Sequence, residues 1–321
     1  MRSLFLPLAL VGLVLAGCES SLDAPTADLS LQTRDALEVL PAGADLAAMV
    51  NLRAAHESAM GRPGGPFSVE GMSGEGAARF DEFVRLTGFD PEEDLDRVYL
   101  AVADTDREAA PAFVVYGDFD RARIDAYLQD NVDADVERTT IAGLPVYLGT
   151  DDEGRRFGLA LVNDEMALAG EERALRAMVQ RVEGGGGLDT DAEMMRLIER
   201  AAYADGAWVA ARNLDAHDDD GHHPAGDLAR AHGQMSRGVV SFDFRRDGVA
   251  MQAVGVPRTG TRTEDVADLL RGGVAAMRTQ AQDEPDVVRA LDDVEVRASG
   301  DAVSVRAFVP QALMDRMAQE H

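Results

Sequence analysis

The strongest constraint on the fold is an alternating stretch at 239–256, which reads VVSFDFRRDGVAMQAVGV. Apolar side chains recur at every second position on both sides of Asp247-Gly248, a dipeptide typical of tight hairpin turns. Such alternation buries one face of each strand and is typical of neighbouring strands that run in opposite directions. The stretch therefore predicts an antiparallel hairpin, and any fold for this chain must contain a sheet of that kind.

Similar patterns recur along the chain and are separated by amphipathic helices. Strand-like runs cover 97–104 and 112–119, a hairpin turns at Asn163-Asp164, and a long helix is expected over 263–282. These elements predict an α+β fold with mostly antiparallel sheets and helices packed on one face. In general layout this resembles the duplicated α+β bodies of uncharacterised bacterial lipoproteins.

Two pairs of segments indicate that the chain consists of two similar halves. GADLAAMVNL at 43–52 resembles GAWVAARNL at 206–214, and a strand–turn–strand–helix unit that starts at Leu95 resembles one that starts at Leu291. The pattern favours a degenerate duplication over a chance likeness of two common units. We therefore expect the following segments: a signal peptide at 1–17, a flexible tether at 18–38, a first half at 39–183, a glycine-rich linker at 184–190 and a second half at 191–321.

The N-terminus has the layout of an export signal. Arg2 precedes an apolar run over about 4–14, which is too short for a helix that spans a membrane. The next residues, Leu15-Ala16-Gly17-Cys18, closely resemble the lipobox of bacterial lipoproteins. That resemblance implies cleavage before Cys18, which becomes the lipidated, palmitate-bearing N-terminus. The alternative is an ordinary signal peptide that is cleaved near Ala16.

Lipidation at Cys18 would anchor the chain to a membrane. Several acyl chains at one residue hold stably, whereas a single chain binds only marginally, at about 0.8 kcal/mol per buried methylene. Glu19 follows the cysteine, and in the lipoprotein family an aspartate there often means retention at the inner membrane. We therefore expect an exported protein that is anchored in the cell envelope, at the outer membrane and facing the periplasm. Because Cys18 is the only cysteine, no disulfide can form within one chain.

The charge of the chain narrows its partners. It carries 58 acidic residues against 31 lysines and arginines, which gives a formal net charge of −27, and none of the 31 is a lysine. Such a surface repels phosphate backbones, so we expect no nucleic acid partner. Salt at 1 M screens charges beyond roughly 3 Å, so an acidic surface suits salty surroundings. A cation-binding surface is the alternative.

The sequence offers few groups for covalent chemistry. Without lysine there is no phosphate-loop lysine and no Schiff base, and no thiol remains beyond Cys18. GMSGEG at 71–76 departs from a nucleophile elbow because Glu75 stands where the last glycine is needed. We therefore read it as a loop, and we expect no catalysis and no cofactor.

One cluster of metal-type side chains lies at 215–232 and gathers four of the six histidines. Imidazole and carboxylate groups together suit zinc, nickel or copper. The candidate ligands are His217, Asp219, His222 and His223. Their spacing matches no compact site, so the favoured interpretation is a flexible polar insertion.

Together these features favour a membrane-anchored lipoprotein with a non-catalytic binding or structural role in the bacterial cell envelope. Its partner would be a protein or an apolar ligand. A first alternative is a carrier of lipid or another apolar ligand, with a cavity under the sheet. A second is a metal-dependent hydrolase that uses the His/Asp-rich insertion.

Overall fold

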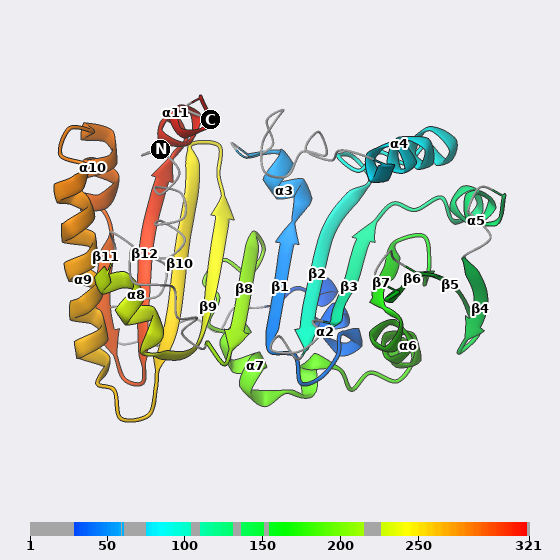
Figure 1. Ribbon diagram of the computed structural model, residues 1–321, viewed down its shortest axis with the longest axis horizontal. Coiled ribbons are helices and arrows are strands. Elements are labelled where there is room, and N and C mark those ends of the chain that lie inside the picture. The colour runs from blue at the N-terminus through cyan, green and yellow to red at the C-terminus, as the bar shows by residue number, and fades with distance from the viewer. Residues whose placement is uncertain are drawn as a thin grey trace. The chain divides into compact units, whose positions relative to one another are not determined.

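The computed structural model describes residues 29–58, 60, 75–103, 110–130, 136–150, 154–214 and 226–319. The chain divides into two compact units: the N-terminal unit, Ser30–Met195, and the C-terminal unit, which takes in Arg196–His321. Each unit is built on antiparallel strands with helices against them, which confirms the predicted α+β class (Figure 1). Within the described ranges, no helix is both long and apolar enough to cross a bilayer.

The N-terminal unit contains strands β1 to β7. Their bounds are β1 Leu46–Asn51, β2 Leu95–Ala103, β3 Ala110–Gly117, β4 Glu137–Ile141, β5 Leu144–Thr150, β6 Arg156–Leu161 and β7 Met166–Glu171. They lie in the order β1-β2-β3-β7-β6-β5-β4, and every pairing described among them is antiparallel. The helices of this unit are α2 Leu31–Val39, α3 Leu52–His56, α4 Glu75–Thr87, α5 Arg121–Asp130, α6 Glu172–Arg181 and the 3-10 turn η2 Leu188–Thr190.

The C-terminal unit contains strands β8 to β12. Their bounds are β8 Ala207–Arg212, β9 Met235–Phe244, β10 Gly248–Pro257, β11 Glu295–Ser299 and β12 Ala302–Pro310, in the order β8-β9-β10-β12-β11. Its helices are α8 Gly226–Gly233, α9 Thr263–Gln280, α10 Pro285–Asp292 and α11 Gln311–Gln319, while α7 Ala192–Ile198 spans the division between the units. The alternating stretch forms β9 and β10, with Phe242 opposite Met251, so the predicted hairpin is confirmed.

The two units share one strand order. In the N-terminal unit the order is β1-β2-β3-β7-β6, so β7, the last of these strands in the sequence, lies between β3 and β6. In the C-terminal unit the order is β8-β9-β10-β12-β11, and β12 likewise lies between β10 and β11. By this order β1 corresponds to β8, as the likeness of 43–52 to 206–214 predicts. The second likeness matches β2 and β3 with β11 and β12. By position in the sheet, however, β2 and β3 correspond to β9 and β10. That pairing of segments is therefore wrong, because strand–turn–strand–helix is a local pattern that recurs at different places in a sheet.

The N-terminal unit carries buried clusters on both faces of its sheet. On one face, Thr33 Oγ1 of α2 lies 3.0 Å from the hydroxyl of Tyr99 on β2. On the other face, Val115 and Ala167, which are paired across β3 and β7, pack with Phe119 and Ile124. This second cluster supports the end of α4 and the start of α5.

Helix α2 occupies a region predicted as flexible. Residues 31–38, expected at the end of the tether, belong to this helix, and Leu37 is fully buried. Ser30 caps the helix because its Oγ accepts a hydrogen bond from the backbone N–H of Thr33 at 3.1 Å. Burial of an apolar stripe therefore overrides the polar composition of this stretch. The expected segment boundaries at 18–38, 39–183, 184–190 and 191–321 otherwise remain predictions.

Candidate functional site

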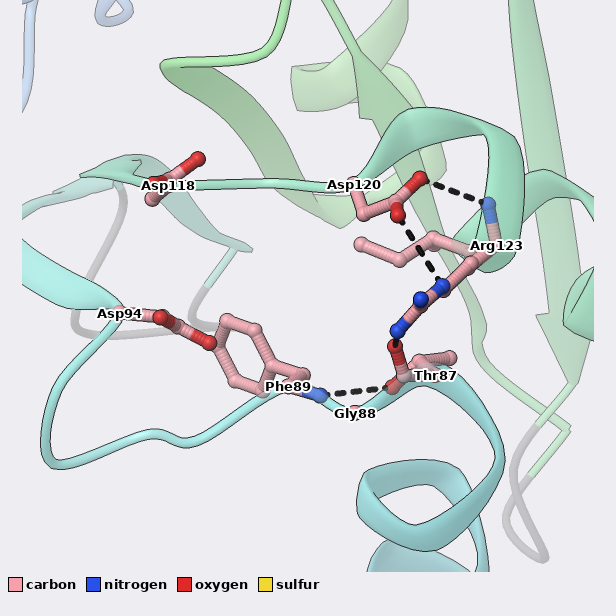
Figure 2. Close-up of a pocket in the computed structure, with 8 residues that line it drawn as sticks. Thr87, Gly88, Phe89, Asp94, Asp118, Asp120 and Arg123 are labelled. Atoms are coloured by element: carbon pink, nitrogen blue, oxygen red, sulfur yellow. Dashed lines mark hydrogen bonds and ion pairs between the residues drawn. The ribbon is translucent and has the colours of Figure 1, made fainter.

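A small pocket in the N-terminal unit is the candidate site (Figure 2). It has a volume of about 190 Å³. Its lining combines residues 87–89 at the end of α4 with Asp94, Asp118, Asp120, Arg123 and Ile124. The pocket therefore lies where α4 ends, β2 begins, β3 ends and α5 begins.

Thr87 and Gly88 form the wall that ends α4. The Thr87 hydroxyl donates to the Phe83 carbonyl at 2.7 Å and accepts from the Phe89 N–H at 3.2 Å. Gly88 takes φ +72°, a left-handed conformation that glycine adopts without steric cost at a helix end. This turn directs the chain away from α4 and brings the Phe89 ring into the lining.

Arg123 joins the two helices across the pocket. Its Nε lies 3.2 Å from Asp120 Oδ2, and its Nη1 donates to the Thr87 carbonyl at 3.4 Å. Asp120 Oδ1 also accepts from the Arg123 backbone N–H at 3.1 Å, as expected of a residue that precedes a helix. Both groups are largely exposed, so this ion pair positions the side chains and contributes little to stability.

The opposite wall is held by backbone contacts. Asp94 Oδ2 accepts from the Asp90 N–H at 2.7 Å, and the Asp94 carbonyl accepts from the Asp118 N–H at 2.8 Å. A Cβ on Gly117 would lie 2.2 Å from that carbonyl oxygen, so only glycine allows the two segments to approach this closely. In Figure 2 the Asp118 carboxylate lies apart from Arg123, and no hydrogen bond or ion pair joins it to the other residues drawn.

A cluster of aromatic rings packs around Phe89, which lines the pocket. The Phe89 and Phe119 rings are stacked with centroids 6.1 Å apart, and Phe83 contacts the Phe89 ring at 5.7 Å and the Tyr127 ring edge-on at 5.3 Å. Such pairs contribute about 0.5–1.5 kcal/mol beyond their burial. The cluster therefore holds α4 against α5 and fixes the shape of the pocket.

This geometry can bind a small polar group, but it does not suit a lipid. Drug-sized ligands occupy roughly 300–1,000 Å³ in mainly apolar pockets. The pocket here is smaller, and most of its lining is charged or polar. Its Thr87 hydroxyl is already bonded at the end of α4, and its guanidinium already joins α5 to α4. Among the residues that the structure describes, no group of three or more His, Cys, Asp or Glu could hold a metal ion.

The site residues predicted from sequence are not among those of the pocket. Cys18 and the candidate metal ligands His217, Asp219, His222 and His223 lie outside the described residues. The chain on either side of that histidine cluster is described, and Arg258 joins its flanks by donating to the carbonyls of Leu214 and Gly233.

His232 is the histidine of the cluster that the structure describes. It belongs to α8, whose last turn also carries Arg230. Burial lowers the pKa of His232, and the positive charge of Arg258 lowers it further. The neutral imidazole is therefore the form that this position favours.

Comparison with known proteins gives a fold and no family. No protein-family model matches the chain, and no curated protein matches it. Crystal structures of the protein TP0453 are similar in fold. Crystal form III has a TM-score of 0.51 and 12% identity, and the match covers 89% of this chain and 98% of that chain. Form IV has a TM-score of 0.49 and 10% identity, covering 89% and 95%. At 12% identity, the likeness to form III shows the fold alone.

The pocket residues were not found by sequence reasoning. In the sequence, Asp120 precedes an amphipathic helix and Ile124 lies on its apolar face, and neither position by itself indicates a pocket. The Thr87–Arg123 contact links residues that are 36 positions apart, and no local pattern reports it. Gly88 after an apolar run was the one available signal, because glycine commonly ends a helix.

Proposed function

We propose that this chain is a membrane-anchored lipoprotein of the bacterial cell envelope with a non-catalytic binding or structural role. Cys18 carries the acyl chains, and the two α+β units form the body that faces the periplasm from the outer membrane. The observation that carries the proposal is Leu15-Ala16-Gly17-Cys18 at the end of an export signal.

The body supports a binding role more than a catalytic one. Arg123, Asp120 and Thr87 are engaged with one another, so the described pocket is arranged to hold α4 and α5 together. The Asp118 carboxylate is the group that the pocket offers to a partner. Its ligand would be a small polar or cationic group or the side chain of a partner protein. No observation on the described residues favours the lipid carrier or the metal-dependent hydrolase.

The anchor is tested by labelling the full chain with an alkyne analogue of palmitate in a bacterial host. We expect the wild type to take up label and to sediment with membranes. Cys18→Ser removes the acylated sulfur, so it should take up no label and should leave the outer-membrane fraction. Ser20→Ala, two residues away, is the matched control and should behave as the wild type does. An unmodified cysteine in the mature wild type, found by mass spectrometry, would overturn the proposal.

A further inference from the structure

Strand β4 is the outer strand of the sheet in the N-terminal unit. It pairs with β5 on one side, and Ile141 lies opposite Leu144 across a two-residue turn. Ala142 and Gly143 in that turn have φ +46° and +81°, as in a type I′ hairpin. In such a hairpin the closing pair is hydrogen-bonded, and bonded pairs alternate along the ladder. Arg138 and Thr140 therefore point their N–H and C=O groups away from β5, at the edge of the sheet.

The charged side chains of β4 do not guard this edge. Edge strands are usually protected by charges that overhang them. Here Glu137 Oε2 lies 2.6 Å from Arg156 Nη2, on a strand inside the sheet. The Arg138 guanidinium lies over the Tyr147 ring at 5.6 Å, and Tyr147 is the residue opposite it on β5. Both charged side chains therefore lie over their own sheet and not beyond the β4 edge. The remaining polar side chains of the strand are those of Thr139 and Thr140.

The outer strand of the C-terminal unit shows what a protected edge looks like in this protein. On β11, the Val296 carbonyl accepts hydrogen bonds from Nε and Nη2 of Arg271, each at 3.3 Å. Arg271 comes from α9 and therefore covers part of the β11 edge with a side chain. Within the described ranges, no hydrogen bond of this kind reaches Arg138 or Thr140 on β4.

We propose that the β4 edge pairs with the β4 edge of a second copy of this chain, in antiparallel orientation about a two-fold axis. In the proposed register Arg138 faces Thr140 of the other copy, because this arrangement bonds both outward residues of each β4 strand and keeps the two Arg138 side chains apart. Thr139 then faces its own counterpart on the axis, and Glu137 faces Ile141. Threonine pairs are favourable across strands, and no like charges stand opposite one another.

The pair is predicted to depend on salt. Each copy has a formal net charge of −27, so two copies repel at low ionic strength. Raising the salt concentration shortens the range of that repulsion and leaves short backbone hydrogen bonds intact. Five residues of edge strand form a small interface, so the dimer is expected to be transient and must be trapped to be seen.

The test uses a disulfide across the two-fold axis in the full, exported chain. Thr139→Cys places two thiols at a non-hydrogen-bonded pair, where Cα atoms lie roughly 4.5 Å apart, within the range that a disulfide spans. We expect a covalent dimer on a non-reducing gel, with more of it as salt rises. Glu137→Cys is the matched control on the same strand. Its two copies would lie roughly 14 Å apart, at about 3.4 Å per residue, so it should give only the background of the wild type.

A second variant distinguishes cross-linking through the proposed strand pairing from cross-linking by random collision. Thr140→Pro removes an outward N–H and places a ring at the edge, which the fold tolerates because that N–H is not part of the β4–β5 ladder. We expect Thr139→Cys with Thr140→Pro to lose about tenfold or more of the cross-linked product. Equal cross-linking by Thr139→Cys and Glu137→Cys, or no loss with Thr140→Pro, would overturn the proposal. An unacylated Cys18 does not confuse these results, because the wild type shows any Cys18–Cys18 product and Glu137→Cys shows any mixed disulfide between Cys18 and a thiol on β4.

Discussion

Gly117 offers the sharpest test of how the pocket is built. It ends β3, and an added Cβ would stand 2.2 Å from the Asp94 carbonyl oxygen and 3.3 Å from Phe119 Cζ. The first neighbour is backbone, so it cannot rotate out of the way as a side chain end could. Gly117→Ala must therefore push apart the segments that carry Asp94 and Asp118.

The expected cost follows from two contributions. Overpacking of a well-packed site costs roughly 1–3 kcal/mol. Moving the Asp94 carbonyl also breaks its 2.8 Å hydrogen bond from the Asp118 N–H, a loss of about 0.5–1.5 kcal/mol. Alanine recovers roughly 0.4–1 kcal/mol by restricting the unfolded chain. We therefore expect Gly117→Ala to lower the free energy of unfolding by about 2 kcal/mol, within a range of roughly 0.5–4 kcal/mol.

The assay is urea denaturation followed by far-ultraviolet circular dichroism and by tryptophan fluorescence. Trp208 is the single tryptophan and is fully buried on β8, so its fluorescence reports on the C-terminal unit. Gly117 belongs to the other unit. A shift in the dichroism midpoint alone would mean that the units unfold separately, whereas a shift in both signals would mean that they unfold together.

Gly184→Ala is the matched control. A Cβ there meets no atom within 4 Å, so we expect stability to stay unchanged or to rise by up to about 1 kcal/mol. If Gly117→Ala changed the free energy of unfolding by no more than Gly184→Ala did, the close approach at Asp94 would not be a feature of the folded protein. The account of the pocket would then fail with it.

Three further predictions concern protons and salt. Because burial and Arg258 lower the pKa of His232, the folded state disfavours its charged form. The contribution of His232 to the free energy of unfolding should be complete above pH ~6.5 and fall as pH falls through the lowered pKa. His232→Gln should therefore give a flatter profile of stability against pH. Burial raises the pKa of Tyr116, so the contribution of its neutral hydroxyl to the free energy of unfolding should be complete below pH ~10 and lost as pH rises further. Alkaline denaturation measures this loss, and Tyr116→Phe should remove it. The net charge of −27 predicts that the urea midpoint of the wild type rises between low salt and about 1 M salt, and a midpoint independent of salt would contradict this reasoning.

The strongly patterned elements could be predicted from the sequence. The 239–256 hairpin has strict alternation and an Asp-Gly turn, and it forms β9 and β10. Helix α5 has a capping aspartate and an apolar face at helical spacing. In both cases the local signal and the buried face agree, so no tertiary information is needed.

The elements that were missed lack one of these signals. Strand β4 reads ERTTI without apolar alternation, and its turn places Ala142 at φ +46°, where asparagine, aspartate or glycine is usual. Helix α4 follows a stretch rich in glycine and proline, although Phe80, Phe83 and Thr87 already stand at helical spacing. The pocket itself depends on Arg123 reaching Thr87 across the fold, which no local pattern can report.

The shared strand order indicates where the two units differ in structure. Asn51 and Asn213 end equivalent strands, β1 and β8, yet they have different roles. Asn51 accepts a hydrogen bond from the Ala54 N–H and starts α3, whereas Asn213 takes a left-handed φ of +56°. The backbone therefore differs at the ends of the two strands, and each unit adds its own elements to the shared strand order. The N-terminal unit adds β4 and β5, and with them the open edge. The β4 edge belongs to what the N-terminal unit adds, and this edge and the α4–α5 pocket are the places to test first for a partner.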